Sequence, residues 1–153
     1  MFKSQSVLLE DIAADDMLPL DTFPAPMAGE EEESGIIRIL MPEFTCVCPK
    51  TGYPDFASIH LYYKPDQVCL ELKAWKLYLN SFRNIGTFHE TFTYYIFKKL
   101  KEVLKPKWMM VVGDFLPRGN VDTTVVFETV EPRPKEADVL VGTVPALCQT
   151  FKI

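Results

Sequence analysis

The chain lacks the long apolar runs, dense cysteines and glycine-rich loops that would each indicate a particular class of protein. No apolar run approaches the ~20 residues that a membrane helix needs, and no secretory signal opens the sequence. Four cysteines in 153 residues make no disulfide framework, so we expect reduced thiols and a cytoplasmic protein. Neither Gly-x-Gly-x-x-Gly nor a Walker-type loop is present, so a dinucleotide would have to bind without a Rossmann domain.

Signatures of metal sites and hydrolases are also missing. Candidate zinc ligands exist in Cys46, Cys48, Cys69, His60 and His89. Their spacing matches no closed structural pattern, because a single residue separates the first two cysteines where about two to four are usual. We therefore predict no metal site. No motif for a serine triad or for a paired-carboxylate glycosidase is found either.

Charge is distributed unevenly along the chain. Residues 1–34 hold nine acids against the single base Lys3, a net charge of −8, which leaves +3 for the rest of a chain whose total is −5. This acidic, proline-containing segment predicts a mobile arm, although its apolar stretches 7–9 and 18–23 could dock on a neighbouring surface. A weakly basic body suits a small anionic ligand, so we expect neither direct nucleic-acid binding nor a membrane partner.

The remainder of the chain predicts two hairpins. Residues 36–47 and 57–63 have the composition of paired strands, and so do residues 108–112 and 121–130, with residues 115–120 as the connecting loop of the second pair. Helical periodicity lies between the two hairpins. This order predicts the α+β class, with a four-stranded antiparallel sheet and two helices on one face. Its exposed strand edges predict association between subunits.

Both helices are predicted from apolar stripes. The stripes are Leu72, Trp75, Leu79 and Phe82 in the first helix, and Phe92, Ile96, Leu100 and Val103 in the second. Lys73 belongs to a basic stripe, which is either a solvated face or a contact for phosphate groups. Thr87 and Glu90 have the spacing of a capping box at the start of the second helix, which ends before Pro106. Alternatively, His89 and Glu90 could hold a polar ring ligand by its edges.

A thiol and a carboxylate stand at the two ends of one short loop. Cys48 is followed by Pro49, which cannot donate the next ladder hydrogen bond, so a strand should end there. Asp55 follows a turn that contains Gly52. This placement suggests a nucleophilic cysteine assisted by an acid. A buried cysteine and an ordinary turn aspartate are the alternative.

Four motifs closely resemble those of the 7-cyano-7-deazaguanine reductases of queuosine biosynthesis. They lie between about Phe44 and Val130, in the order and at the spacings of that family. They read Cys48-Pro-Lys-Thr-Gly-x-Pro-Asp55-Phe, Glu71-Leu-Lys-Ala-Trp-Lys-Leu-Tyr78, Ser81-Phe-Arg-Asn-x-Gly-x-Phe-His-Glu90 and Pro117-Arg-Gly119. Asn120 departs from the family, which commonly has glycine there, and the segments 1–34 and 132–153 match nothing in it.

The resemblance implies a fold, an activity and an assembly. The fold would be a tunnelling fold (T-fold) over residues 35–131, assembled into an oligomeric ring with active sites between subunits, and 132–153 would be an unassigned tail. The activity would be that of a nitrile oxidoreductase that reduces 7-cyano-7-deazaguanine to 7-aminomethyl-7-deazaguanine with two NADPH. The chain lacks the duplicated half of longer members, so the resemblance is to the short, single-module type.

The resemblance also implies a role for individual residues. Cys48 would be the nucleophile that forms a covalent thioimide, and Asp55 the proton donor. Substrate contacts would come from Leu70, Glu71, Leu72, His89 and Glu90, with Phe88 closing over the ring. Cofactor contacts would come from Leu72, Lys73, Arg118 and Gly119.

Two other functions remain open. An amidinotransferase-like relative would keep the cysteine chemistry but add ammonia to the nitrile on tRNA; the motif from Glu71 to Tyr78 favours the reductase. A noncatalytic pterin- or purine-binding member of the same fold would need only a carboxylate to anchor the ring. Cys48 and Asp55 at the family's spacing argue against it.

Overall fold

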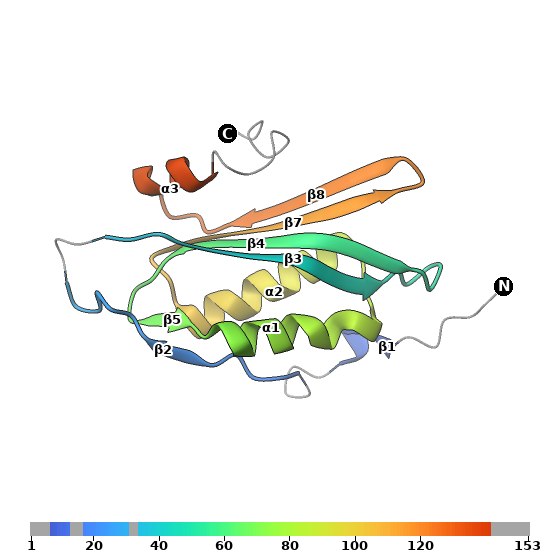
Figure 1. Ribbon diagram of the computed structural model, residues 1–153, viewed down its shortest axis with the longest axis horizontal. Helices are drawn as coiled ribbons and strands as arrows, with labels where there is room; N and C mark the ends of the chain where they lie inside the picture. The colour runs from blue at the N-terminus through green and yellow to red at the C-terminus, as the bar shows by residue number, and fades with distance from the viewer. Residues whose placement is uncertain (1–6, 13–16, 31–33, 142–153) are drawn as a thin grey trace.

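Four long strands form the centre of the sheet in the computed structural model, which describes residues 7–12, 17–30 and 34–141 (Figure 1). In sheet order they are β3 (Ile37–Val47), β4 (Pro54–Lys64), β7 (Trp108–Arg118) and β8 (Val121–Glu128), and each of the four is antiparallel to the next. The α+β class predicted from the sequence is confirmed. The pairing of β3 with β4 shifts register between Met41 and Phe44, next to Pro42, where proline cannot donate to the ladder.

Short strands join the acidic segment to the rest of the domain. β1 (Val7–Leu8) runs parallel to β6 (Ile85–Gly86), which in turn lies beside the end of β3. A separate pair joins β2 (Thr22–Pro24) to β5 (Val68–Leu70). A 3₁₀ turn, η1 (Leu9–Asp11), directly follows β1 and precedes β2 in the chain.

The described part of the arm packs against the domain, whereas the sequence predicts a mobile segment over residues 1–34. Leu9 and Leu20 are buried in the main core at 4% and 8% exposure. The physical reason is that these two leucines can bury enough apolar area to offset the cost of ordering a short, acidic stretch.

Two helices cover one face of the sheet. α1 (Leu72–Asn80), followed by a 3₁₀ turn, η3 (Ser81–Asn84), and α2 (His89–Leu104) lie together on one side in Figure 1, with α3 on the other side. The core between this face and the helices is aromatic, and Phe44 stacks on Phe92 with ring centroids 4.1 Å apart. Leu72 is 60% exposed, so the predicted apolar stripe of α1 is wrong at its first residue and instead includes the buried Tyr78.

α3 (Lys135–Val141) covers part of the opposite face, within the segment that the sequence leaves unassigned. Its Ala137 is fully buried against a second apolar cluster that contains Trp108. Arg133, just before the helix, donates to both carboxylate oxygens of Glu128 at 2.9 and 2.6 Å, and the indole N–H of Trp108 donates to the same carboxylate at 2.8 Å. These hydrogen bonds attach the segment directly before α3 to β8.

The predicted capping box at α2 is wrong. The N-cap is Phe88, one residue later than expected, and no side chain caps the helix. Thr87 is buried and donates its hydroxyl hydrogen to the carbonyl of Phe88 at 3.2 Å. Because β6 and the Thr87 N–H bond to the Val47 carbonyl hold this chain in an extended form, the helix starts late and Glu90 is left exposed without a capping partner.

The connection between β7 and β8 is shorter than predicted. Residues 115–118 belong to β7, and only Gly119 and Asn120 form the turn, with φ of +55° and +66°. A two-residue hairpin turn with both central residues at positive φ needs glycine, asparagine or aspartate. Asn120 therefore satisfies the turn as the glycine of the family would.

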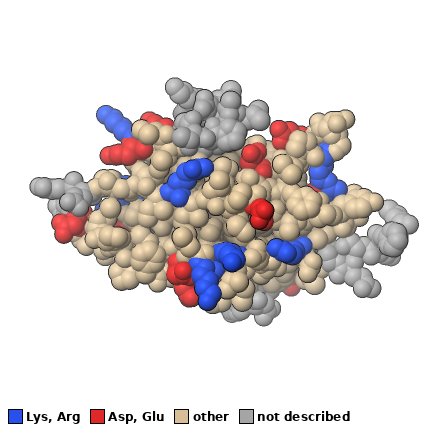
Figure 2. Space-filling view, in the orientation of Figure 1, with Lys and Arg blue, Asp and Glu red and all other residues tan. Residues whose placement is uncertain are grey.

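Charged side chains are spread over the surface instead of forming one large patch on the face shown in Figure 2. On the face shown in Figure 2, lysine and arginine stand singly or in small groups among acids, without a broad basic patch. Among the described residues, no helix is long and apolar enough to span a membrane.

Candidate active site

Cys48 lies at the exit of β3, as the sequence predicts. Its N–H donates to the Tyr53 carbonyl at 2.8 Å, and its own carbonyl accepts from the Gly52 N–H at 2.9 Å. Gly52 has a φ of +73°, a conformation that favours glycine, so this closed turn depends on it. The Cys48 side chain is half-buried at the end of this turn. Burial raises the pKa of the thiol, but hydrogen bonds from the Thr51 side chain and the backbone outweigh it, and the pKa is lowered overall.

Asp55 sits opposite the end of β3 and is almost completely buried, at 3% exposure. Its carboxylate contacts two side chains from distant parts of the chain. Arg118 donates from Nη1 to Oδ1, and His89 places Nε2 3.3 Å from Oδ2. The structure thus brings Cys48, Asp55, His89 and Arg118 together at one end of the sheet.

The other cysteine of the motif is unsuited to nucleophilic attack. Cys46 is fully buried on β3, in register with Asp55. Burial, with the negative charges of Asp55 and Cys48 added, raises the pKa of Cys46 to about 12. Because the thiolate is the reactive form of a cysteine, Cys48 is better suited to nucleophilic attack than Cys46.

His89 is the first residue of α2 and is held by packing against β7. Its ring stacks on Phe115 of β7, with centroids 3.8 Å apart and planes 7° apart. Its carbonyl accepts a hydrogen bond from the Thr93 hydroxyl at 2.7 Å. α2 can approach β7 this closely because Gly113 has no side chain; a Cβ there would lie 2.6 Å from Thr93 Oγ1.

Sequence reasoning missed two of these supporting residues. Thr51 accepts from Arg118 Nη2 at 3.3 Å and also stabilises the Cys48 thiolate, but within the motif it reads as an ordinary turn residue. Phe115 was assigned to a loop, and only its place on β7 puts its ring under His89. No signal in the sequence separates it from the other aromatic core residues.

Glu90 and Phe88 lie at the start of α2 beside His89, and both side chains are exposed. Glu90 has no capping role, so its carboxylate is available to a ligand. Phe88 is 49% exposed and lies directly before His89.

The segment Leu70–Lys73 lies at the other end of the sheet from Asp55. The Leu70 N–H donates to the hydroxyl of Tyr63 at 3.0 Å, and Tyr63 is eight residues along β4 from Asp55. At ~3.3 Å per residue this separation is roughly 26 Å. In Figure 1, β5 and the start of α1 accordingly lie at the opposite end of the sheet from the β3–β4 turn.

Glu71 has a local structural role. It is the N-cap of α1, and its two carboxylate oxygens accept from the N–H groups of Lys73 at 2.9 Å and Ala74 at 2.7 Å. These backbone hydrogen bonds lower the pKa of Glu71. Next to it, the side chains of Leu72 and Lys73 are exposed.

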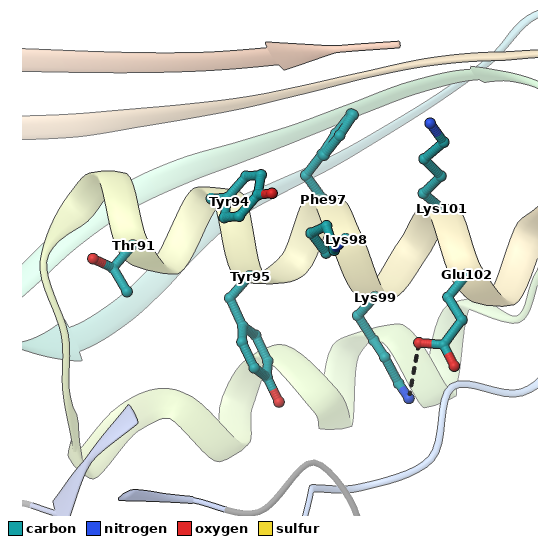
Figure 3. Close-up of a pocket in the computed structure, with 8 residues that line it drawn as sticks. All are labelled: Thr91, Tyr94, Tyr95, Phe97, Lys98, Lys99, Lys101 and Glu102. Atoms are coloured by element: carbon teal, nitrogen blue, oxygen red, sulfur yellow. Dashed lines mark ion pairs between the residues drawn. The ribbon is translucent and has the colours of Figure 1, made fainter. Parts of the chain in front are cut away.

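Two other observations on the described residues concern metal binding and the surface of α2. Within those ranges, no group of three or more His, Cys, Asp or Glu side chains could hold a metal ion. A hollow of about 910 Å³ on the outer surface is lined only by α2 residues between Thr91 and Glu102. Figure 3 shows its side chains pointing in several directions, with Lys99 paired to Glu102 at 3.9 Å. None of these residues belongs to the cluster around Cys48.

Comparisons with known proteins agree on one family. A family model described as QueF-like protein matches residues 54–134. The NADPH-dependent 7-cyano-7-deazaguanine reductase of Alkalilimnicola ehrlichii is 49% identical over 113 residues, which cover 74% of this chain and 85% of that protein. The protein of the same name from Anaeromyxobacter sp. (strain K) is 55% identical over 106 residues, covering 69% and 84%.

A solved structure supports the same fold. The crystal structure of the archaeosine synthase QueF-Like in the apo form superposes with a TM-score of 0.60, over 67% of this chain and 100% of that one. Their sequences are 20% identical, so this comparison bears on the fold alone. The family model matches more than half of the chain, and the alignments cover 85% and 84% of the two relatives. The chain therefore belongs to the QueF-like protein family.

Proposed function

We propose that this chain is an NADPH-dependent nitrile reductase that converts 7-cyano-7-deazaguanine to 7-aminomethyl-7-deazaguanine in queuosine biosynthesis. The observation that carries the proposal is the pairing of the Cys48 thiol, whose pKa is lowered, with the buried carboxyl of Asp55. Relatives of up to 56% identity bear the name of that reductase. Cytoplasmic location is part of the proposal.

The chemistry begins with the thiolate of Cys48. The thiolate adds to the nitrile carbon, one π bond of the nitrile opens, and the nitrogen takes a proton, which gives a thioimide. Asp55 is the donor of that proton, and His89, 3.3 Å from it, can exchange protons with it. A thioimide carbon accepts hydride more readily than a nitrile carbon does. Two molecules of NADPH supply the hydrides when they are bound.

The residues proposed for the cofactor fit a dinucleotide. The Arg118 side chain is 33% exposed, and a guanidinium has five N–H donors in a planar fork that suits phosphate oxygens. No atom lies within 4 Å of the position where Gly119 would carry a Cβ, so a ligand can approach its backbone. Lys73 and Leu72 present exposed side chains at the opposite end of the sheet.

We further propose that each active site is made by two copies of the chain in a T-fold ring. Leu70–Lys73 lies too far from Asp55, roughly 26 Å along β4, for one deazaguanine ring to contact both in the same subunit. Among the residues that the structure describes, β8 is the last strand on its side of the sheet, so its outer edge can pair with another copy. Cys48, His89 and Glu90 of one subunit would then meet Leu70–Lys73 of the next.

A coupled assay tests the proposed activity. Purified, reduced protein is mixed with the nitrile and NADPH, and the nicotinamide absorbance is followed while the product is quantified. Two NADPH should be oxidised for each aminomethyl product. Consumption of ammonia with no oxidation of NADPH would instead support the amidinotransferase-like alternative, and ring binding without turnover would support a noncatalytic binding protein.

Subunit complementation tests the shared site. Cys48→Ala and Lys73→Ala proteins should each be impaired, because each loses one half of every site. Mixed, dissociated and reassembled, they should recover up to about one quarter of the wild-type sites, since random pairing restores both native halves at that frequency. Sedimentation of a fully active monomer, or no recovery in mixed oligomers, would contradict the shared site.

A further inference from the structure

The N-terminal arm contacts the chain directly beside both halves of the proposed site. Its first described piece, residues 7–12, includes β1, and its second, residues 17–25, includes β2. Neither piece holds a residue to which catalysis or ligand binding is assigned. Their partner strands, β6 and β5, each lead directly into residues that are assigned such a role.

β1 supports the half of the site that contains Cys48. It lies along β6, which ends at Gly86, and Gly86 in turn pairs with Val47 at the end of β3. The N–H of Thr87 donates to the Val47 carbonyl at 3.0 Å. Cys48 follows Val47 directly, and α2 begins at His89. β6 is thus held between the arm and the strand that carries the nucleophile at its exit.

β2 supports the half formed by Leu70–Lys73. It pairs with β5 in a sheet of two strands, separate from the main sheet. Directly before this pair, the carbonyl of Asp21 accepts from the Glu71 N–H at 2.9 Å. Both carboxylate oxygens of Glu71 accept from N–H groups in the first turn of α1. The arm therefore holds the residue that caps α1, and Leu72 and Lys73 are the first two residues of that helix.

Each piece of the arm is anchored by one buried leucine. Leu9 directly follows β1, Leu20 directly precedes Asp21, and both pack in the main core. The strands themselves are only two and three residues long. Because such short strand pairs are unstable in water, burial of the two leucines is what keeps them paired.

We propose, on the basis of the function above, that Leu9 and Leu20 are positioning residues for two different halves of the site. Leu9, through β1 and β6, holds the exit of β3 and the start of α2, where the thioimide forms. Leu20, through β2 and the cap of α1, holds the side chains that contact the cofactor. Loss of either leucine should therefore affect one step of the reaction and spare the other, whereas a merely structural role would change both alike.

Amide hydrogen exchange of the full-length protein tests these contacts without any substrate. Leu20→Ala should accelerate exchange at residues 70–74 by at least about tenfold and leave residues 85–89 as protected as in the wild type. Leu9→Ala should do the reverse. The two variants are matched controls, because each removes one buried leucine of the arm from the same core.

Kinetics should show the same division. Leu20→Ala should raise the KM for NADPH by about tenfold, equivalent to the loss of about one hydrogen bond to a charged ligand, with thioimide formation near the wild-type rate at saturating nitrile. Leu9→Ala should slow thioimide formation by up to about 10²-fold, for a displacement near 1 Å, and leave the KM for NADPH near the wild-type value. Leu9→Met and Leu20→Met conserve the buried volume and should behave as the wild type.

The outcomes separate this proposal from the proposed function. Equal effects of Leu9→Ala and Leu20→Ala on both steps would show that the arm contributes only to stability, and would overturn the proposal. Wild-type exchange at residues 70–74 in Leu20→Ala, or at residues 85–89 in Leu9→Ala, would do the same. The proposed function fails instead if the wild type forms no thioimide and oxidises no NADPH with the nitrile, and the exchange pattern still decides the role of the arm. Where an alanine variant does not fold, the valine variant at the same position provides the comparison.

Discussion

Replacing Gly113 by alanine should disturb the active site from beneath. Gly113 lies on β7 where α2 crosses it, and a new Cβ would lie 2.6 Å from Thr93 Oγ1 and 2.9 Å from Phe115 Cε2. Neither neighbour can move easily, because Thr93 and Phe115 are buried at 0% and 1% exposure and Phe115 also stacks on His89. Because neither side chain can move aside, α2 itself must shift away from the sheet to make room for the new methyl group.

The expected cost follows from the packing. Overfilling a close-packed site costs about 1–3 kcal/mol, and the loss of glycine freedom in the unfolded chain returns about 0.4–1 kcal/mol, so Gly113→Ala should destabilise by about 1–2 kcal/mol. Thr93→Ala alone loses the hydrogen bond to the His89 carbonyl, at about 1 kcal/mol. Combined, the two changes should cost less than their sum by about 1 kcal/mol, because removing the Thr93 side chain makes room for the new methyl group.

Denaturation and adduct kinetics check this together. Urea midpoints are compared at one protein concentration, because association also contributes to stability. Since His89 lies one helical turn before Thr93, Gly113→Ala should also slow thioimide formation, by up to about 10²-fold for a displacement near 1 Å. A Gly113→Ala protein as stable and as fast as the wild type, or a double variant whose cost is additive, would refute the argument that this close approach positions His89.

Three further outcomes are expected. Cys48→Ala should abolish both the covalent adduct, seen by intact-protein mass, and turnover, while Cys46→Ala should keep both; an adduct in Cys48→Ala would remove the proposed nucleophile. Burial raises the pKa of Glu128, but hydrogen bonds from Arg133 and Trp108 lower it overall. The ionised carboxylate therefore stabilises the folded state fully above the ordinary pKa of 4.5, and this stabilisation is lost as the pH falls through the lowered pKa of the folded state. Glu128→Gln should therefore cost about 1–2 kcal/mol in denaturant titrations at pH 7 and less in acid; an equal cost at both pH values would contradict this. Removing residues 1–34 should lower stability by about 3–6 kcal/mol, because two buried leucines are lost; an unchanged urea midpoint would show that the segment does not dock.

The parts of the fold that the sequence predicts are those whose burial repeats regularly. β3, β4 and most of α2 follow apolar patterns of strand or helix period, and their ends coincide with proline or glycine. Pro106 follows the end of α2, and Lys105 before it takes the left-handed conformation with a φ of +43°. Local pattern and tertiary packing agree in these segments, so either one is sufficient to locate them.

The parts that the sequence does not predict depend on contacts between distant segments. Leu9 and Leu20 dock into a core built by residues far along the chain, and their acidic surroundings conceal this. α3 is short and finds its place through Ala137 and the Arg133–Glu128 ion pair. Neither a period nor a turn signal marks such contacts.

The candidate site divides in the same way. Cys48 and Asp55 could be predicted because one short loop joins them, and chain geometry alone brings them close. The contact of Asp55 with Arg118 spans 63 positions in the sequence, and it could not be predicted because the sequence assigns Arg118 to an exposed loop. The resemblance assigned Arg118 to the cofactor, and the structure adds its contact with the acid.

The two glutamates of the motifs show how an error in capping changes the interpretation of a site. The sequence gives Glu90 a capping role and the resemblance gives Glu71 a contact with the ring. In the structure Glu71 caps α1 with both carboxylate oxygens, whereas Glu90 caps nothing and is exposed beside His89. Each Glu71 carboxylate oxygen already accepts from one N–H group of α1, so a ligand would compete with the helix cap for its orientation. In the proposed reductase, Glu90 would therefore be the carboxylate that accepts from the N–H donors of the deazaguanine ring, and Glu71 would contact the ring through its backbone.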